Sequence, residues 1–193
     1  MAGLAVAAPL QQRETAAAIV QKIAPDSVTC SDTKECRTAS QAAPFLINAM
    51  QKYGVTSPGE IAGVLALMAF ESDSFKYKHN ISPGRPGQGT ANMQMIDYNI
   101  KYASSIPELV DEVSALGDIS TDDQKNKLLA LVTPDKYNFG SGPWFLTTQC
   151  ASIRTQLQAG TDAGFAAYMG CVGVTVTEDR NAFWSRAKAA FGL

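Results

Sequence analysis

Residues 57–75 read SPGEIAGVLALMAFESDSF, and the rest of the chain is organised around this stretch. It opens with the pattern of a helix start: a serine N-cap, a proline in the first helical position and a glutamate three residues after the cap. Residues 61–70 carry no charged or hydroxyl side chain, and their bulky members cover every face of a helix. This composition predicts a helix that lies inside the domain and ends at Glu71.

Glu71 is the strongest candidate for a catalytic group because it follows this apolar helix directly. Burial and the partial negative charge at a helix C-terminus both disfavour an ionised carboxylate. A general acid must hold a proton that it can give to its substrate. The position of Glu71 therefore predicts a general acid, whereas the plainer interpretation is a surface carboxylate just past a helix end.

The next segment, residues 80–90, reads NISPGRPGQGT and is followed by ANMQMID at 91–97. A loop this rich in glycine and proline lets the backbone approach a ligand closely. Asn92 and Gln94 offer amide groups for hydrogen bonding, and Asp97 offers a second carboxylate. Together these residues predict a polar substrate cleft that faces Glu71.

Three short motifs occur along the chain: Glu71-Ser72, then Met93-Gln94 after the glycine-rich loop, then AAYMGC at residues 166–171. In this order they resemble the motifs of the lysozyme-like superfamily, which includes the goose-type lysozymes and the soluble lytic transglycosylases. The chain also resembles secreted fungal muramidases. The resemblance spans residues 60–184, and it implies a mainly α, lysozyme-like single domain with little or no β-sheet.

The resemblance implies a secreted, antimicrobial muramidase that cleaves the β-1,4 glycosidic bonds of peptidoglycan, with Glu71 as general acid. Asp97 lies near the position of a family carboxylate and is the leading candidate to activate water, with Asp73 as the second choice. Hydrolysis between two such carboxylates would invert the anomeric centre. The alternative for Asp97 is a helix N-cap, since aspartate is favoured there.

The same interpretation assigns substrate contacts to polar and aromatic side chains around the cleft. They are Ser72, Asp73, Asn92, Gln94, Tyr137 and Tyr168. Tyr137 lies in the glycine-rich aromatic segment 136–144, which would either form a platform for sugar rings or begin a buried helix at Trp144. Other functions stay open: a lytic transglycosylase, a chitin or chitosan hydrolase, or a secreted glycan-binding or effector protein without turnover.

Composition narrows the class of protein. A chain of 193 residues with 46% hydrophobic and 18% charged residues suits one globular domain. A net charge of −2 gives no electrostatic footprint for nucleic acid, and no apolar run reaches the ~20 residues that span a bilayer. With one histidine and no phosphate-binding motif, we expect a monomer without cofactor or metal, whose partner is peptidoglycan rather than nucleic acid or membrane.

The four cysteines predict two disulfides, Cys30–Cys36 and Cys150–Cys171, and hence an oxidising compartment. The competing zinc site lacks both the C-x-x-C spacing and a histidine partner. Residues 1–24 are interpreted as an N-terminal segment, with a remnant of a secretory signal or a plain small-residue terminus followed by a helix at 11–23. Residues 25–193 form the expected catalytic domain of a secreted, extracellular protein.

Further helices are expected where the apolar residues recur at helical spacing. They cover residues 39–53, 106–116, 121–132, 149–157, 165–168 and 178–191. Residues 172–176 alternate β-branched side chains and predict either a short strand or an extended loop.

Overall fold

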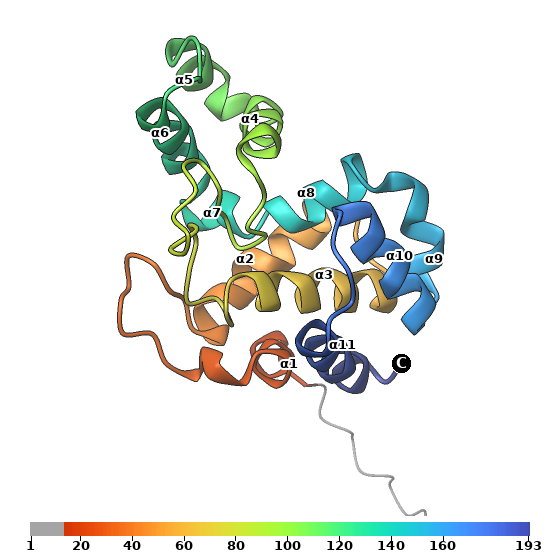
Figure 1. Cartoon of the computed structure of the whole chain (residues 1–193). Coiled ribbons are helices and arrows are strands. Elements are labelled where there is room, and N and C mark those ends of the chain that lie inside the picture. Colours follow the sequence, from red (N-terminus) through yellow and green to blue (C-terminus); the bar gives the residue numbers. More distant parts are fainter. Residues whose placement is uncertain (1–13) are drawn as a thin grey trace, which may run out of the picture.

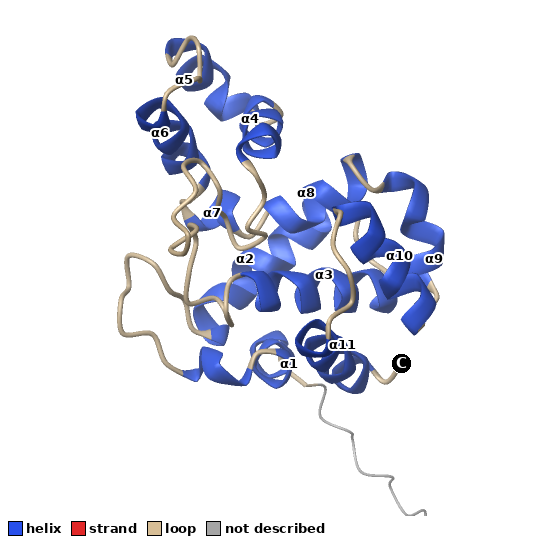
Figure 2. Ribbon diagram, viewed as in Figure 1, coloured by secondary structure: helices blue, strands red, loops and turns tan. Residues whose placement is uncertain are grey.

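The computed structural model describes residues 14–193, which form helices joined by loops (Figures 1 and 2). Within these residues β structure is limited to two isolated bridges, which join Gly89 to His79 and to Gln94. The predicted mainly α class with little or no β-sheet is therefore confirmed. The expected signal remnant lies outside the described residues.

The α-helices are α1 (Ala16–Ile23), α2 (Ala39–Lys52), α3 (Pro58–Glu71), α4 (Ile96–Ser104), α5 (Val110–Ala115), α6 (Asp122–Val132), α7 (Asp135–Asn138), α8 (Ser141–Thr148), α9 (Arg154–Gln158), α10 (Asp162–Val172) and α11 (Glu178–Phe191). Short 3-10 helices cover Pro25–Val28, Pro107–Leu109 and Ala151–Ile153. In Figure 1, α4, α5 and α6 form a lobe that projects from the larger body. Helix α4 packs against α6 within this lobe.

Helix α3 runs through the middle of the larger body, with α1 and α11 on one side and α8, α9 and α10 on the other (Figure 1). Its residues from Ala62 to Ala69 are all buried, which confirms the helix predicted to be apolar on every face. Helix α11 packs along α3, and Trp184 of α11 is fully buried there. The predicted end of α3 at Glu71 is also confirmed.

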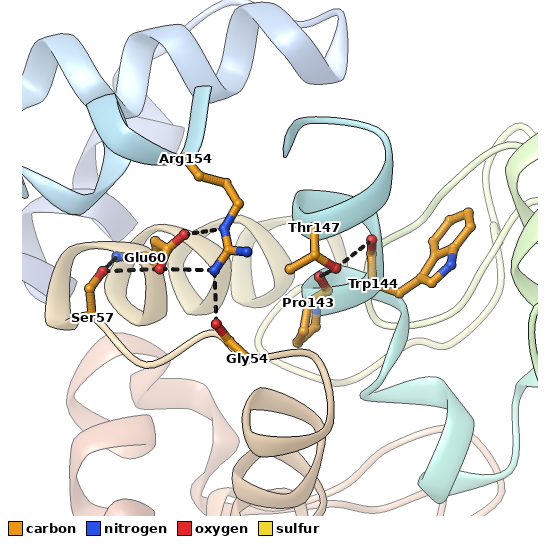
Figure 3. A network of polar contacts seen from close by, with 7 residues as sticks. All are labelled: Gly54, Ser57, Glu60, Pro143, Trp144, Thr147 and Arg154. Atoms are coloured by element: carbon orange, nitrogen blue, oxygen red, sulfur yellow. Dashed lines mark hydrogen bonds and ion pairs between the residues drawn. The ribbon is translucent and has the colours of Figure 1, made fainter. Parts of the chain in front are cut away.

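The start of α3 differs in one respect from the expected capping box. The Ser57 hydroxyl does accept a hydrogen bond from the Glu60 backbone N–H, at 3.1 Å. The Glu60 carboxylate, however, binds the Arg154 guanidinium of α9, with Nε donating to Oε1 at 2.6 Å (Figure 3). Arg154 Nη2 also donates to the Gly54 carbonyl at 2.8 Å. A partly exposed cation from α9 therefore takes the place of the expected backbone partner of the buried Glu60 carboxylate.

Two glycines of α3 allow α9 to approach this closely. A Cβ atom on Gly59 would clash with the backbone carbonyl oxygen of Leu157, and one on Gly63 would clash with the Leu157 side chain. Glycine is the residue that permits such contact between backbones. Helix α3 thus presents glycines at the positions where it meets α9.

Two segments for which the sequence left alternatives open are decided by the structure, and one predicted helix differs. For residues 136–144 the buried-helix alternative is correct, because they contain α7 and the start of α8, and both Tyr137 and Trp144 are buried. The single helix expected at 106–116 is divided into a 3-10 turn after Ile106 and the separate helix α5. After the left-handed C-cap Gly173, residues 174–177 connect α10 to α11 without regular structure, so the loop alternative for 172–176 is correct.

Both predicted disulfides are confirmed, with Cα–Cα separations of 5.5 Å for Cys30–Cys36 and 5.9 Å for Cys150–Cys171. These separations fall in the ordinary range for disulfides. No helix within residues 14–193 has both the length and the apolar character needed to cross a membrane.

Candidate functional site at the end of helix α3

Glu71 forms an ion pair at the C-terminal end of α3. Arg180 Nη2, from the first turn of α11, donates a hydrogen bond to Glu71 Oε1 at 2.9 Å. The Glu71 side chain is 21% exposed and that of Arg180 is 15% exposed. The carboxylate is therefore neither sealed from water nor surrounded by apolar groups alone, as the sequence argument for a general acid had supposed.

Aromatic packing holds Arg180 in this position. Its guanidinium carbon lies 4.4 Å from the centroid of the Phe70 ring, a cation–π arrangement. Phe70 in turn contacts Phe183 of α11 edge to face, with ring centroids 5.9 Å apart. The guanidinium is thus fixed between the end of α3 and the start of α11.

The backbone is strained from the second residue after Glu71 onward. Asp73, Ser74 and Phe75 are consecutive non-glycine residues with φ values of 49°, 60° and 64°. Each residue held in this left-handed region costs on the order of 1 kcal/mol or more, and such strain clusters at functional sites. Ser72 holds the turn together, since its buried hydroxyl donates to the Met68 carbonyl at 2.7 Å and accepts from Phe75 N–H at 2.9 Å.

Two buried donors next to this ion pair lack partners within the described residues. They are the Tyr168 hydroxyl and Arg180 Nε. Burial raises the pKa of the Tyr168 hydroxyl, and the negative charge of Glu71 nearby raises it further, so this group stays protonated. Unpartnered buried polar groups are rare in native proteins and call for a functional or structural explanation.

The polar loop expected to bind substrate instead forms a network within the protein. Gln94 Nε2 donates to Asn99 Oδ1 at 2.9 Å, and Asn99 Nδ2 donates to the Gly87 carbonyl at 2.8 Å. Asn92 Nδ2 is 3.4 Å from Gln94 Oε1, while Asn92 Oδ1 is buried without a partner in the described residues. These amides fix the loop, and Thr90, at φ 64°, is a further strained residue within it.

Three other predicted site residues form no hydrogen bond or ion pair with Glu71 or Arg180 within the described residues. Asp73 is exposed and pairs with Lys76 at 3.1 Å. Asp97 is exposed in the first turn of α4, where Met95 is the N-cap, so Asp97 is not the cap that the alternative expected. Tyr137 is buried in α7, and its carbonyl accepts a hydrogen bond from Tyr102 at 2.7 Å.

Of the predicted residues, the structure brings together Glu71, Ser72 and Tyr168. Sequence reasoning missed Arg180 as a member of the site. The available signal was its place in Asp179-Arg180-Asn181, directly before the last helix, but nothing in that pattern says which distant carboxylate the arginine meets. Residues 14–193 contain no group of three or more His, Cys, Asp or Glu side chains arranged to hold a metal ion.

No family model matches the chain, and no solved structure matches it. One relative is a bifunctional dioxygenase (DOX)-epoxy alcohol synthase (EAS) of Fusarium oxysporum (strain Fo5176). It is 53% identical to this chain over 158 residues. The match covers 80% of the chain but 12% of the relative, so this chain corresponds to a small part of that protein.

This finding corrects the function expected from the sequence. The relative is named for dioxygenase and epoxy alcohol synthase activities, which contradicts the predicted muramidase, its antimicrobial role and its peptidoglycan partner. The glycan-cleaving and glycan-binding alternatives are not retained either.

Proposed function

We propose that this chain is an acid–base catalytic domain in which Glu71 passes a proton from water to the oxygen of a neutral epoxide. The observation that carries the proposal is the partly exposed Glu71–Arg180 ion pair, with three strained residues that begin two positions after Glu71. A carboxylate that is held in one orientation and still reaches water can serve first as a base and then as an acid. The strained turn supports this position as a site rather than a simple helix end.

The proposed reaction adds water across one C–O bond of the epoxide. Glu71, ionised beside Arg180, accepts a proton from water while the water oxygen bonds to an epoxide carbon and the C–O bond breaks. The proton on Glu71 then passes to the oxygen that has left that carbon. No oxidant or reductant is needed, and the carboxylate returns to its starting form.

The substrate class is taken from the chemistry named for the relative. An epoxy alcohol carries an epoxide and a hydroxyl group, and both are neutral. A domain in the same chain as an epoxy alcohol synthase would meet such a product. Because the present chain matches only 12% of that relative, neither of the two named activities is assigned to it.

Incubation of the chain with 2,3-epoxyhexan-1-ol in ¹⁸O-labelled water tests the proposal. We expect a triol that carries one ¹⁸O atom, detected by mass spectrometry. Glu71→Gln should lower the rate of its formation by about a hundredfold or more, the usual contribution of a general acid or base. Glu112→Gln, the same change on the exposed surface of α5, is the matched control. Equal rates for the wild type and Glu71→Gln would show that Glu71 is not the catalytic group.

Asp97 is tested in the same assay. Its predicted role in activating water gains no support from the contacts of Glu71, which pairs with Arg180. We therefore expect Asp97→Asn to retain most of the rate. A loss comparable to that of Glu71→Gln would return Asp97 to the site as a second carboxylate.

We further infer that the fold is related to the lysozyme-like domains. In support, a buried helix ends at a glutamate, and a tyrosine from the third motif, Tyr168, lies near that carboxylate. A shared fold does not carry a shared reaction, so this inference says nothing about substrate. The two disulfides also support a protein that works in an oxidising, extracellular compartment.

A further inference from the structure

A pocket of about 330 Å³ lies among α1, α2, α3 and α11, away from the Glu71 site. Its α3 wall is formed by Ile61 and Leu65. Leu65 precedes Glu71 by six residues, or about 9 Å along the helix axis at 1.5 Å per residue. The pocket is therefore a separate feature of the fold.

The walls of this pocket are apolar except for Gln51 and Thr56. The apolar side chains are aliphatic or methionine apart from Phe191, and none of the wall residues in the described range 14–193 is charged. Ile47 lines the pocket and exposes 43% of its surface. Pockets of about 300 to 1,000 Å³ with mainly hydrophobic walls and a few polar groups are typical binding sites for small molecules.

We propose that this pocket binds one short, unbranched alkyl chain with a neutral hydroxyl head. The lack of aromatic walls other than Phe191 favours a flexible aliphatic chain over a flat ring. The volume is near the lower limit for ligand pockets, which suits a single chain.

The two polar wall residues define the head group. The Gln51 amide and the Thr56 hydroxyl are exposed and make no side-chain hydrogen bond within the described residues, so both can bond to a ligand hydroxyl. A carboxylate head would find no cation to pair with among the described wall residues, whereas a hydroxyl can both donate to and accept from these two groups. A neutral head is therefore preferred over an anionic one.

Titration of the full chain with 1-octanol, followed by calorimetry and thermal melting, tests the proposal. We expect saturable binding of one molecule per chain and a rise in Tm with octanol concentration, since a ligand that binds only the folded state stabilises it. Octanoate should bind at least tenfold more weakly. Octanoate binding as tight as octanol would overturn the neutral head, and a lack of saturable octanol binding would overturn the site.

Two substitutions locate the binding. Ala43→Leu places extra methyl groups in the pocket from α2 and should weaken octanol binding at least tenfold, whereas Ala163→Leu on the exposed side of α10 should not change it. If Ala43→Leu does not fold, as judged by circular dichroism, Ile47→Gln at the partly exposed wall serves instead and should weaken binding severalfold. Unchanged affinity in a folded pocket variant would mean that octanol binds elsewhere.

Discussion

Helix α3 begins and ends with a glutamate paired to an arginine from a distant helix, but the two pairs differ in their surroundings. At the start, the Glu60 side chain is 1% exposed, and Arg154 reaches both of its carboxylate oxygens and the Gly54 carbonyl. At the end, Glu71 is 21% exposed and a single hydrogen bond joins it to Arg180. The same two residue types thus form an ion pair with a buried carboxylate at one end and an ion pair with a water-accessible carboxylate at the other.

The backbone next to each pair shows the same contrast. The start of α3 has an ordinary N-cap, in which Ser57 satisfies the first-turn N–H of Glu60. The end of α3 is followed by the strained turn 73–75 and lies beside the unpartnered hydroxyl of Tyr168. Strain and unpartnered donors persist where surrounding structure imposes them, often for function, which is why we place the site at Glu71 and not at Glu60.

The largest loss of stability is expected when the buried Glu60–Arg154 pair is broken. Arg154→Met leaves the Glu60 carboxylate buried without its cation, and removal of one partner from a buried ion pair costs about 3 kcal/mol of folding free energy or more. Chemical denaturation should show this loss relative to the wild type. Arg85→Met, at an exposed loop position, is the control and should change stability by less than about 0.5 kcal/mol. A small loss for Arg154→Met would mean that water reaches Glu60.

The equivalent change at the other end should have a smaller effect on stability and a larger one on rate. Arg180→Met frees a carboxylate that water already reaches, so we expect a loss of about 1 to 2 kcal/mol, between the values for exposed and buried pairs. The hydration rate of the epoxide probe should fall because Glu71 loses its orientation. A variant that loses stability but keeps its full rate would remove Arg180 from the site.

Two tyrosine hydroxyls provide a finer comparison. Tyr102→Phe removes one of the two donors to the Tyr137 carbonyl, which keeps the Gly140 N–H, and the lost hydrogen bond costs about 1 kcal/mol. Tyr168→Phe removes a hydroxyl that has no partner within the described residues, so stability should stay within about 0.5 kcal/mol of the wild type or rise. Equal losses in both variants, measured by chemical denaturation, would show that the Tyr168 hydroxyl is bonded in solution.

The smallest effect is expected at an exposed pair, Asp162 with Lys188. The hydrogen bonds from Lys188 and from the Trp184 ring lower the pKa of the Asp162 carboxyl, and its side chain is 73% exposed. Because the folded pKa is lowered, the stabilisation is present above the ordinary value of 3.8 and is lost as pH falls through the lower, folded value. The Tm difference between the wild type and Asp162→Asn should therefore be slight at pH 7 and disappear in acid. A difference that grows in acid would contradict this assignment.

Local sequence patterns were sufficient for several features of this protein. The apolar stretch 61–70 between a serine N-cap and Glu71 predicted the central helix and its end correctly, because an all-apolar helix is stable only inside a domain. Short loop separation and an even number of cysteines predicted both disulfides. For the aromatic segment 136–144 local pattern left a loop and a buried helix open, and packing in the core decided for the helix.

The partners of charged and polar groups were decided only by the tertiary structure. Glu60 meets Arg154 across 94 residues of sequence, and Glu71 meets Arg180 across 109. Local spacing specifies which side chains share a helix face, but helix packing determines which face meets which, and so whether a carboxylate is buried, paired or open to water. The sequence alone therefore identified Glu71 as the residue to examine, while its charge partner, its exposure and the strained turn beside it required the folded chain.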